Sequence, residues 1–407
     1  MIVPYPALEA YRRDLAATPG RASFGAADAY WLAVTQGLWR VAQLPPDERR
    51  SALETFAGSL AAAGEPDLET LRAAMAGLLD DDPDALAITA VLRWAAAVER
   101  AGALHVAYSA LAALRELVPE RHHRAHGLIL AQQGRISREV GDLSTAADLY
   151  AQAERAGREC DDAEVTVRSV LGQGVLAVIR GNYPAARAHF RRALGVAKTH
   201  GLQVHASAAH HGLLRAALAA GNLEAALLHG WDAFRNAGGD RHRQADMLVN
   251  LGEVCLLVSR PAAALRAYRT ALRLTSLPSI RLGALGGAVI AAARLGDRGA
   301  LDELSHETEQ TFSHVAEGYE HAVTMVELAE AFAILGDAPR RDVYRTRALQ
   351  LAEERGFYEV VHRAETITRG AATTKEARRP PTLSDGAVGV LRAIESLDPS
   401  ASAAASR

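Results

Sequence analysis

Histidines gather in two short stretches of the sequence, and imidazole is the side chain most often used to bind metals in proteins. The members are His122, His123 and His126 in the first stretch, and His200, His205, His210 and His211 in the second. His122 and His126 stand four residues apart, which can place two imidazoles on one face of a helix. No carboxylate or cysteine follows at a third helix-turn spacing. We therefore interpret these histidines as helix-start and loop residues, and we predict no metal site.

A glycine-rich segment, Gly172 to Ala177 (GQGVLA), formally fits a dinucleotide-binding pattern. That pattern requires a strand before it and a helix after it, whereas this segment lies inside a predicted helix where Gly174 serves helix packing. The sequence has no phosphate-binding loop, no His-Glu-x-x-His zinc motif and no nucleophile elbow. We predict no cofactor and no catalytic activity, because no pattern of converging titratable residues is present.

The composition favours closely packed helices. Hydrophobic residues make up 49% of the chain but aromatic residues only 5%, and alanine and leucine dominate. Sheets are richer in β-branched and aromatic residues. The formal net charge of −3 draws the chain neither to nucleic acid nor to an anionic membrane. The basic residues on predicted second helices are interpreted as solvated surface: Arg191, Arg192, Arg266, Arg269 and Arg273.

Two features predict a cytoplasmic protein. The two cysteines, Cys160 and Cys255, are far apart and have no metal-type neighbours, which is typical of a reducing compartment. No uncharged apolar run approaches the length of about 18 residues that a membrane helix needs. We therefore expect no membrane partner.

Turn signals recur along the chain at intervals of 37 to 40 residues. They stand at Gly64, Gly102, Gly141, Gly181, Gly221, Ser259, Gly296 and Gly336. A residue in the left-handed conformation at such a position ends a helix cleanly, and glycine adopts that conformation most readily. The spacing predicts tandem pairs of helices, each pair joined by one of these turns.

Small and aromatic residues fall in register around the turns. The columns are Ala146, Ala186, Ala226 and Ala264; Tyr150, Phe190, Gly230 and Tyr268; and, seven residues before the turn, Gly134, Gly174 and Gly252. Small residues allow two helix axes to cross closely, and an aromatic ring fills the space beside the crossing. We predict that these positions are structural.

The stretch from Ala245 to Leu272 (ADMLVNLGEVCLLVSRPAAALRAYRTAL) carries these features together and resembles the tetratricopeptide repeat. It departs from the repeat signature at Leu248, where tryptophan is usual, and at Cys255, where an aromatic residue is usual. The period of about 40 residues is similar to that of arrays in bacterial signal-sensing proteins, including ATP-dependent LuxR-type regulators and peptide-pheromone receptors. The resemblance implies an all-α, right-handed α-solenoid of about seven to eight tandem repeats.

The predicted organisation has four parts. Residues 1–46 form an N-terminal helical cap that includes a helix at 24–44. Residues 47–357 form the repeat array, and residues 358–370 end its last helix. Residues 371–407 form a linker and a partly disordered tail with a short helix at 387–397.

The resemblance also implies binding residues. In tetratricopeptide arrays the first helix of each repeat lines a concave groove, and peptides are held two positions before the conserved glycine and one position after it. The matching residues are Gln132 and Arg135, Arg215 with the adjacent His211, Asn250 and Glu253, and Glu327 and Glu330. Arginines at one end and glutamates further along would orient a peptide that carries both charge signs.

The sequence therefore predicts a non-catalytic scaffold that binds a protein or peptide partner. Two alternatives stay open. A regulatory sensor would bind a small molecule or signalling peptide in an apolar pocket near Leu171, Val175 and Leu218. A homo-oligomeric structural protein would expose an apolar patch at Trp31 and Trp39.

Overall fold

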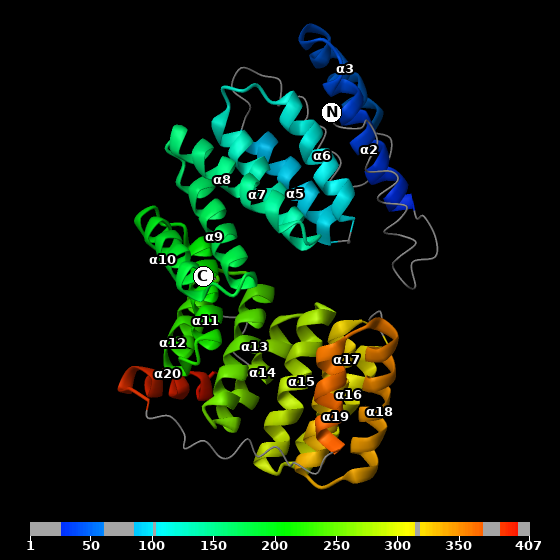
Figure 1. Ribbon diagram of the computed structural model, residues 1–407, viewed down its shortest axis with the longest axis vertical. Coiled ribbons are helices and arrows are strands. Elements are labelled where there is room, and N and C mark those ends of the chain that lie inside the picture. The colour runs from blue at the N-terminus through cyan, green and yellow to red at the C-terminus, as the bar shows by residue number, and fades with distance from the viewer. Residues whose placement is uncertain (1–25, 61–84, 101–102, 314–317, 369–382, 398–407) are drawn as a thin grey trace. The chain divides into compact units, whose positions relative to one another are not determined.

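The computed structural model describes residues 26–60, 85–100, 103–313, 318–368 and 383–397, and in these ranges helices are the only regular secondary structure (Figure 1). They contain eighteen helices and no strand, which confirms the all-α prediction. The predicted turns at Gly64 and Gly102 lie outside the described residues. No helix in the described ranges combines the length and hydropathy that a membrane span requires.

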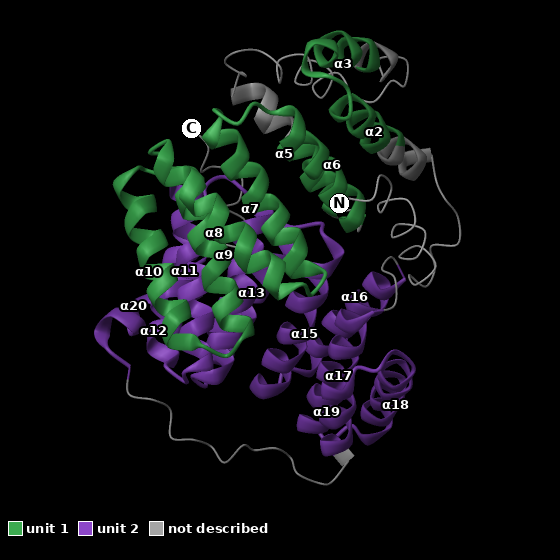
Figure 2. Cartoon of the chain, turned by 45° about the horizontal axis from the view of Figure 1, so that its top comes forward, with its two compact units in different colours: residues 1–201 green, residues 202–407 purple. Residues whose placement is uncertain are grey.

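The chain divides into two compact units, residues 1–201 and residues 202–407 (Figure 2). The helices of unit 1 are α2 (Ala26–Ala42), α3 (Pro46–Leu60), α5 (Ala85–Arg100), α6 (Leu104–Leu117), α7 (His123–Glu139), α8 (Leu143–Glu159), α9 (Ala163–Ile179) and α10 (Tyr183–Thr199). Those of unit 2 are α11 (Gln203–Ala219), α12 (Leu223–Arg235), α13 (Arg241–Leu257), α14 (Pro261–Leu274), α15 (Pro278–Leu295), α16 (Arg298–Phe312), α17 (Tyr319–Ile334), α18 (Ala338–Arg355), α19 (Tyr358–Thr368) and α20 (Asp385–Glu395).

Helix length accounts for the sequence period. The helices α7 to α11 are each 17 residues long and are separated by turns of three residues. Left-handed residues end α7 to α10 in succession: Gly141, Asp161, Gly181 and Gly201, with φ of 87°, 51°, 70° and 67°. Two such helices with their turns span 40 residues. The turns within pairs are those that the sequence predicts, and the turns between pairs use the same device.

Each turn combines the end of one helix with the start of the next. Asn182, which follows Gly181, takes part in both. Its backbone N–H donates to the Ala177 carbonyl of α9 at 2.8 Å, and its side chain accepts from the Ala185 N–H of α10 at 3.2 Å. These bonds satisfy backbone groups that helix ends leave unpaired. Ser259 adopts the same left-handed conformation (φ 60°) before α14.

The repeat packing follows one rule in both units. A first helix contacts its own second helix and, in most repeats, the next first helix: α7 contacts α8 and α9, and α13 contacts α14 and α15. The aromatic residue of the second helix lies over a glycine of the first: a Cβ atom added to Gly252 would lie 2.6 Å from the Tyr268 ring, and one added to Gly174 would lie 2.6 Å from the Phe190 ring. Both glycines are therefore required by a close approach.

The C-terminal helix α20 packs against α12 and α14, which are second helices (Figure 1). It buries four apolar residues there, Ala387, Val390, Leu391 and Ile394. The predicted tail helix is thus present, beginning and ending two residues earlier than expected. It covers second helices and contributes to the core of unit 2.

Candidate functional site

Unit 2 carries a connected set of polar side chains on its first helices. The members are His211 and Arg215 on α11; Asp246, Asn250 and Glu253 on α13; Glu327 and Glu330 on α17; and Arg363 on α19. We call this set the polar face. It contains all six residues that the sequence predicts for unit 2, and adds Asp246 and Arg363.

The three polar residues of α13 share one side of the helix because their spacing is i, i+4 and i+7. The opposite side buries Leu248 and Leu251 in the core of unit 2. Asp246 belongs to this stripe because it lies one helical turn before Asn250, whose Nδ2 donates to the Asp246 carbonyl at 2.7 Å. The helical period therefore provides a signal for Asp246, whereas spacing measured from the glycine alone does not.

His211 and Asp246 face each other across α11 and α13. Burial lowers the pKa of His211 and raises the pKa of Asp246, and the attraction between the two groups opposes both shifts. The Nε2 atom of His211 is buried and has no hydrogen-bond partner among the described residues. Buried polar atoms are almost always paired. Asn250 is the neighbouring side chain that favours the charged form of this imidazole.

Glu327 is the most perturbed acid of the polar face. Burial raises its pKa to about 8, Arg363 opposes this rise, and Glu330 and Glu253 add to it. The carboxyl group lies against the backbone of α15 at Gly286, where an added Cβ atom would overlap Oε2. A glycine at this position of α15 therefore makes the room that Glu327 occupies.

Glu253 is accessible to water, yet burial among neighbouring groups raises its pKa, while Arg215 and Arg363 lower it. The two observations agree if the carboxyl is recessed: neighbouring protein removes part of its hydration without closing it off. Such a group is reachable by a ligand and gains more from a cation than a fully hydrated acid does.

Acidic side chains outnumber guanidinium groups on the polar face. Its four acids face only two guanidinium groups, and burial keeps His211 toward its neutral form. Arg363 pairs with Glu330 at 3.2 Å. Within the described residues, Asp246, Glu253 and Glu327 form no ion pair closer than 4.0 Å, and Arg215 forms none either. Three carboxyl groups therefore lack a direct cationic partner.

The predicted residues of unit 1 have internal partners instead. Gln132 donates to Oε2 of Glu99 on α5 at 2.5 Å, and Arg135 forms an ion pair with the same oxygen. Burial raises the pKa of Glu99 to about 7, with Arg135 opposing the rise and Glu139 adding to it. The structure thus joins Gln132 and Arg135 to each other through Glu99, which the predicted spacing does not single out.

Unit 1 also contains an open cleft of about 500 Å³ at α8, α9 and α10. Small apolar residues line most of it, with Gln173, Arg180 and His189 among the polar ones. Gln173 donates to Glu154 at 2.7 Å. Leu171 and Val175 are not part of this lining. The glycine-rich GQGVLA segment lies within α9, and its two glycines pack against Tyr150 and Phe190.

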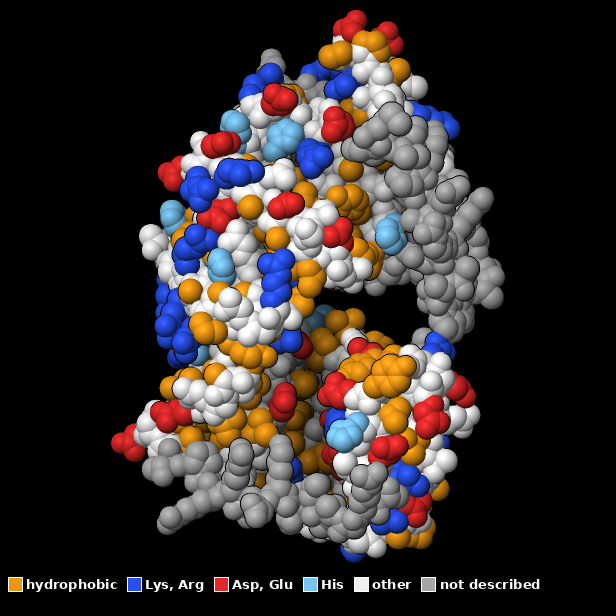
Figure 3. Space-filling model, viewed as in Figure 1, with side chains coloured by type: hydrophobic (Ala, Val, Ile, Leu, Met, Phe, Trp, Pro, Cys, Tyr) orange, Lys and Arg blue, Asp and Glu red, His pale blue; other side chains and the backbone are white. Residues whose placement is uncertain are grey.

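The surface of α10 is basic. Lys and Arg side chains gather along one edge of the molecular face over this helix (Figure 3). Four of its exposed residues are cationic, Arg187, Arg191, Arg192 and Lys198, and α10 contains no acid. Arg192 is engaged by Glu154 at 3.1 Å. This surface is positively charged and exposed to solvent, whereas the polar face of unit 2 is mainly acidic and partly buried.

The two histidine stretches of the sequence separate in the structure. In the first, His126 Nε2 lies 3.1 Å from the Val118 carbonyl, to which it donates, so its role is to hold the turn before α7. In the second, His210 is buried at 3% exposure in the middle of α11, and only its neighbour His211 reaches the polar face. The interpretation of His210 as a loop or helix-start residue is wrong, because α11 continues for nine residues beyond it.

The described residues define a helical-repeat protein built from tandem antiparallel helix pairs. Neither a protein-family model nor a curated protein matches the sequence. Among the solved structures that are similar to this chain, two share 12% sequence identity with it. One is a Rap protein in complex with competence and sporulation factor, with a TM-score of 0.49, covering 82% of this chain and 98% of that one. The other is aspartyl phosphate phosphatase F from Bacillus subtilis, also with a TM-score of 0.49, covering 93% and 97%.

Proposed function

We propose that this chain is a non-catalytic, tetratricopeptide-like scaffold whose polar face binds a peptide carrying a cationic group. The observation that supports it is the set of three carboxyl groups, Asp246, Glu253 and Glu327, that have raised pKa values and form no ion pair with another residue in the described ranges. A lysine or arginine side chain, or a peptide amino terminus, would supply the missing charge.

Cation binding would be coupled to proton release. Since the pKa of Glu327 is about 8, this carboxyl is mostly protonated at pH 7. A cation placed beside it favours the ionised form and lowers its pKa. The resulting charge-assisted hydrogen bonds are stronger than neutral ones because the site is only partly hydrated.

Two other residues of the polar face would bind the rest of the peptide: Asn250 its backbone and Arg215 an acidic group. Asn250 donates from Nδ2 to the backbone carbonyl of Asp246, and its side chain also lies beside His211. Its Oδ1 would accept from a peptide N–H in the bound state. Arg215 on α11 would take a carboxylate of the ligand, while Glu327 on α17 would take the cation. The peptide would then lie across the first helices with its acidic group toward α11.

The test is isothermal titration of the full chain with hexapeptides that differ only in one residue, lysine, glutamate or alanine. We expect the lysine peptide to bind at least about 10-fold more tightly than the alanine peptide, which corresponds to one charge-assisted contact of about 1.4 kcal/mol. At pH 7 the measured enthalpy should vary with the buffer's ionisation enthalpy, which reports a released proton.

Glu327→Gln should weaken binding of the lysine peptide about 10-fold and abolish the proton release. The matched control is Glu303→Gln on the second helix α16, where the glutamate is exposed and lies 3.6 Å from Arg269. Equal binding of the three peptides, or equal losses in the two variants, would remove the basis for the proposal.

A further inference from the structure

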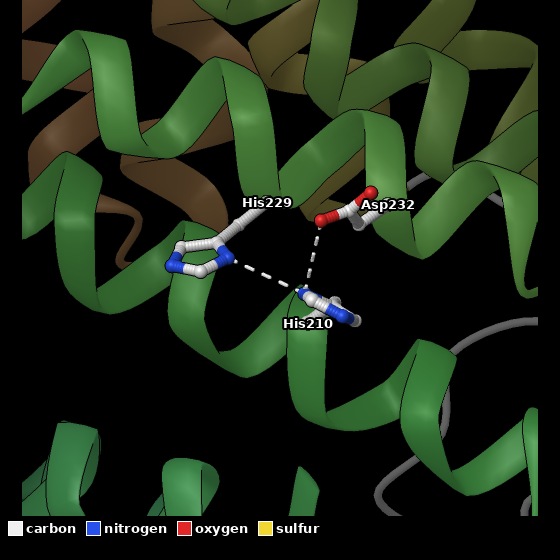
Figure 4. A group of neighbouring side chains, drawn as sticks. All are labelled: His210, His229 and Asp232. Carbon is white, nitrogen blue, oxygen red and sulfur yellow. Dashed lines mark hydrogen bonds and ion pairs between the residues drawn. The ribbon is translucent and has the colours of Figure 1, made fainter. Parts of the chain in front are cut away.

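Three potential metal ligands converge between α11 and α12, away from the set defined as the polar face. They are His210 on α11, and His229 and Asp232 on α12 (Figure 4). One donor atom of each lies within 4.8 Å of the other two. His210 is buried, and the two α12 residues are partly buried. Two imidazoles and one carboxylate form a donor set that suits zinc.

The distances fit a shared ion. Nδ1 of His210 lies 3.3 Å from Nδ1 of His229. Tetrahedral zinc, with bonds of about 2.0–2.1 Å, holds two ligand nitrogens about 3.3 Å apart. Oδ2 of Asp232 lies 3.9 Å from Nδ1 of His210, about 0.6 Å more than this spacing, and all three donor atoms lie within 4.8 Å of one another.

The two helices hold these side chains in place. His229 and Asp232 share one face of α12 because they are three residues apart. The turn at Gly221 (φ 70°) joins α11 directly to α12, and the buried Ser207 hydroxyl donates to the Ala233 carbonyl at 2.7 Å, which fastens the two helices near the cluster. Arg235 donates to the other Asp232 oxygen, Oδ1, at 2.5 Å. The carboxylate thus has an outer partner that fixes its direction, as metal-binding carboxylates commonly have.

We propose that His210, His229 and Asp232 bind one divalent transition-metal ion, with zinc as the best fit. Three protein ligands leave a fourth tetrahedral position for water or for a group from a bound molecule. Without metal, one imidazole donates its Nδ1 proton to the other across the 3.3 Å gap. With metal, both rings bind through Nδ1 and carry their protons on Nε2, so one Nδ1 proton leaves that position. The ion fastens α12 to α11, the helix that also carries His211 and Arg215.

The sequence analysis predicts no metal site and does not identify this cluster. His210 and His229 are 19 residues apart and belong to different helices, so no linear ligand motif connects them. The signal lies in the antiparallel pairing of α11 and α12, which brings the middle of α11 beside the second half of α12.

The test uses the full chain without an affinity tag, stripped of metal by a chelator and titrated with zinc in the presence of a competing colorimetric chelator. We expect one tightly bound equivalent and a higher melting temperature with zinc. Cobalt(II) should give the visible absorption of a tetrahedral site. Binding of less than one equivalent, or only the absorption of octahedral cobalt, would overturn the proposal.

Two partly buried ligands provide variants that should fold: His229→Ala and Asp232→Asn. Each should weaken zinc binding at least about 100-fold, since loss of an outer-shell partner alone costs 10–100-fold. His362→Ala on α19 is the control, because His362 is exposed, and it should bind zinc as the parent chain does. Zinc affinity that survives both ligand variants, or falls equally in the control, would show that the metal binds elsewhere.

Discussion

The two units contain buried glutamates that share one cause of pKa elevation but have different partners. Burial raises the pKa of Glu99 in unit 1 to about 7 and that of Glu327 in unit 2 to about 8. Glu99 forms an ion pair with Arg135 and accepts a hydrogen bond from Gln132. Glu327 forms no ion pair within the described residues, since Arg363, the nearby arginine, pairs with Glu330.

The difference separates a structural acid from a candidate binding acid. In unit 1 the cation that offsets the buried charge is part of the same repeat array, so a ligand would have to displace it. Among the described residues of unit 2, Glu327 has no such ion pair, so a ligand would supply one without breaking an existing pair. A buried charge without a partner is costly, which is why we propose the polar face of unit 2, rather than the surface around Glu99, as the binding surface.

The substitutions with the largest expected effect test whether the two units unfold independently. Gly252→Trp in unit 2 and Gly174→Trp in unit 1 each force a large side chain into an aromatic ring at a close helix crossing. Each should cost more than about 3 kcal/mol of unfolding free energy, because the core cannot expand to accept an indole. Hydrogen exchange measured by mass spectrometry should show lost protection mainly in the unit that carries the substitution.

Gly195→Trp is the control for these variants, because Gly195 lies on α10 and an added Cβ atom there would meet open space. It should leave exchange protection unchanged in both units. Equal loss of protection in both units from either core variant would show that the units unfold together and would weaken the comparison between them.

A smaller effect is expected in how the unfolding free energy depends on pH through Glu99 and Glu327. Both acids bind protons more tightly in the folded state than in the unfolded state, whose pKa is near the ordinary value of 4.5. Their stabilising contribution is therefore complete below pH 4.5. It is lost as the pH rises through about 7 for Glu99 and about 8 for Glu327.

Glu327→Gln should raise the unfolding free energy by about 1–2 kcal/mol at pH 8.5 and change it little at pH 5, since it removes a desolvated charge that has no paired cation. Glu99→Gln should gain less at high pH, because it also removes the ion pair with Arg135. Chemical denaturation between pH 5 and 8.5 measures both. Identical pH profiles for the two variants would mean that the partners of the two glutamates do not differ in effect.

The sequence predicts the helical-repeat fold well because residues close together in the sequence determine each turn and each helix crossing. Left-handed residues such as Gly181 and capping residues such as Asn182 act within a few positions, and the glycine–aromatic columns mark each helix crossing. The candidate site is predicted less completely. Asp246 follows from helical periodicity, whereas Arg363 and Glu99 come from distant helices, and only packing shows which charge meets which.

Gly286 is another residue that the sequence does not single out, because it lies outside the aligned glycine and aromatic columns. On α15 its missing side chain gives Glu327 its place, whereas Gly283, one turn earlier, is exposed and would meet only Val249 at an ordinary distance of 3.6 Å. Alanine favours a helix over glycine by about 1 kcal/mol, so Gly283→Ala should stabilise unit 2 and leave peptide binding unchanged. Gly286→Ala should gain little stability because its Cβ displaces the Glu327 carboxyl.

The displaced carboxyl of the Gly286→Ala variant becomes more hydrated, so its pKa should fall toward 4.5 and its affinity for the lysine hexapeptide should fall about 5- to 10-fold, or about 1 kcal/mol. Titration of both glycine variants at pH 7 in two buffers measures the affinity and the released proton together. If Gly286→Ala and Gly283→Ala bind the peptide alike and release the same number of protons, then the recessed position of Glu327 contributes nothing to recognition. The contrast between the two glutamates would then concern stability alone.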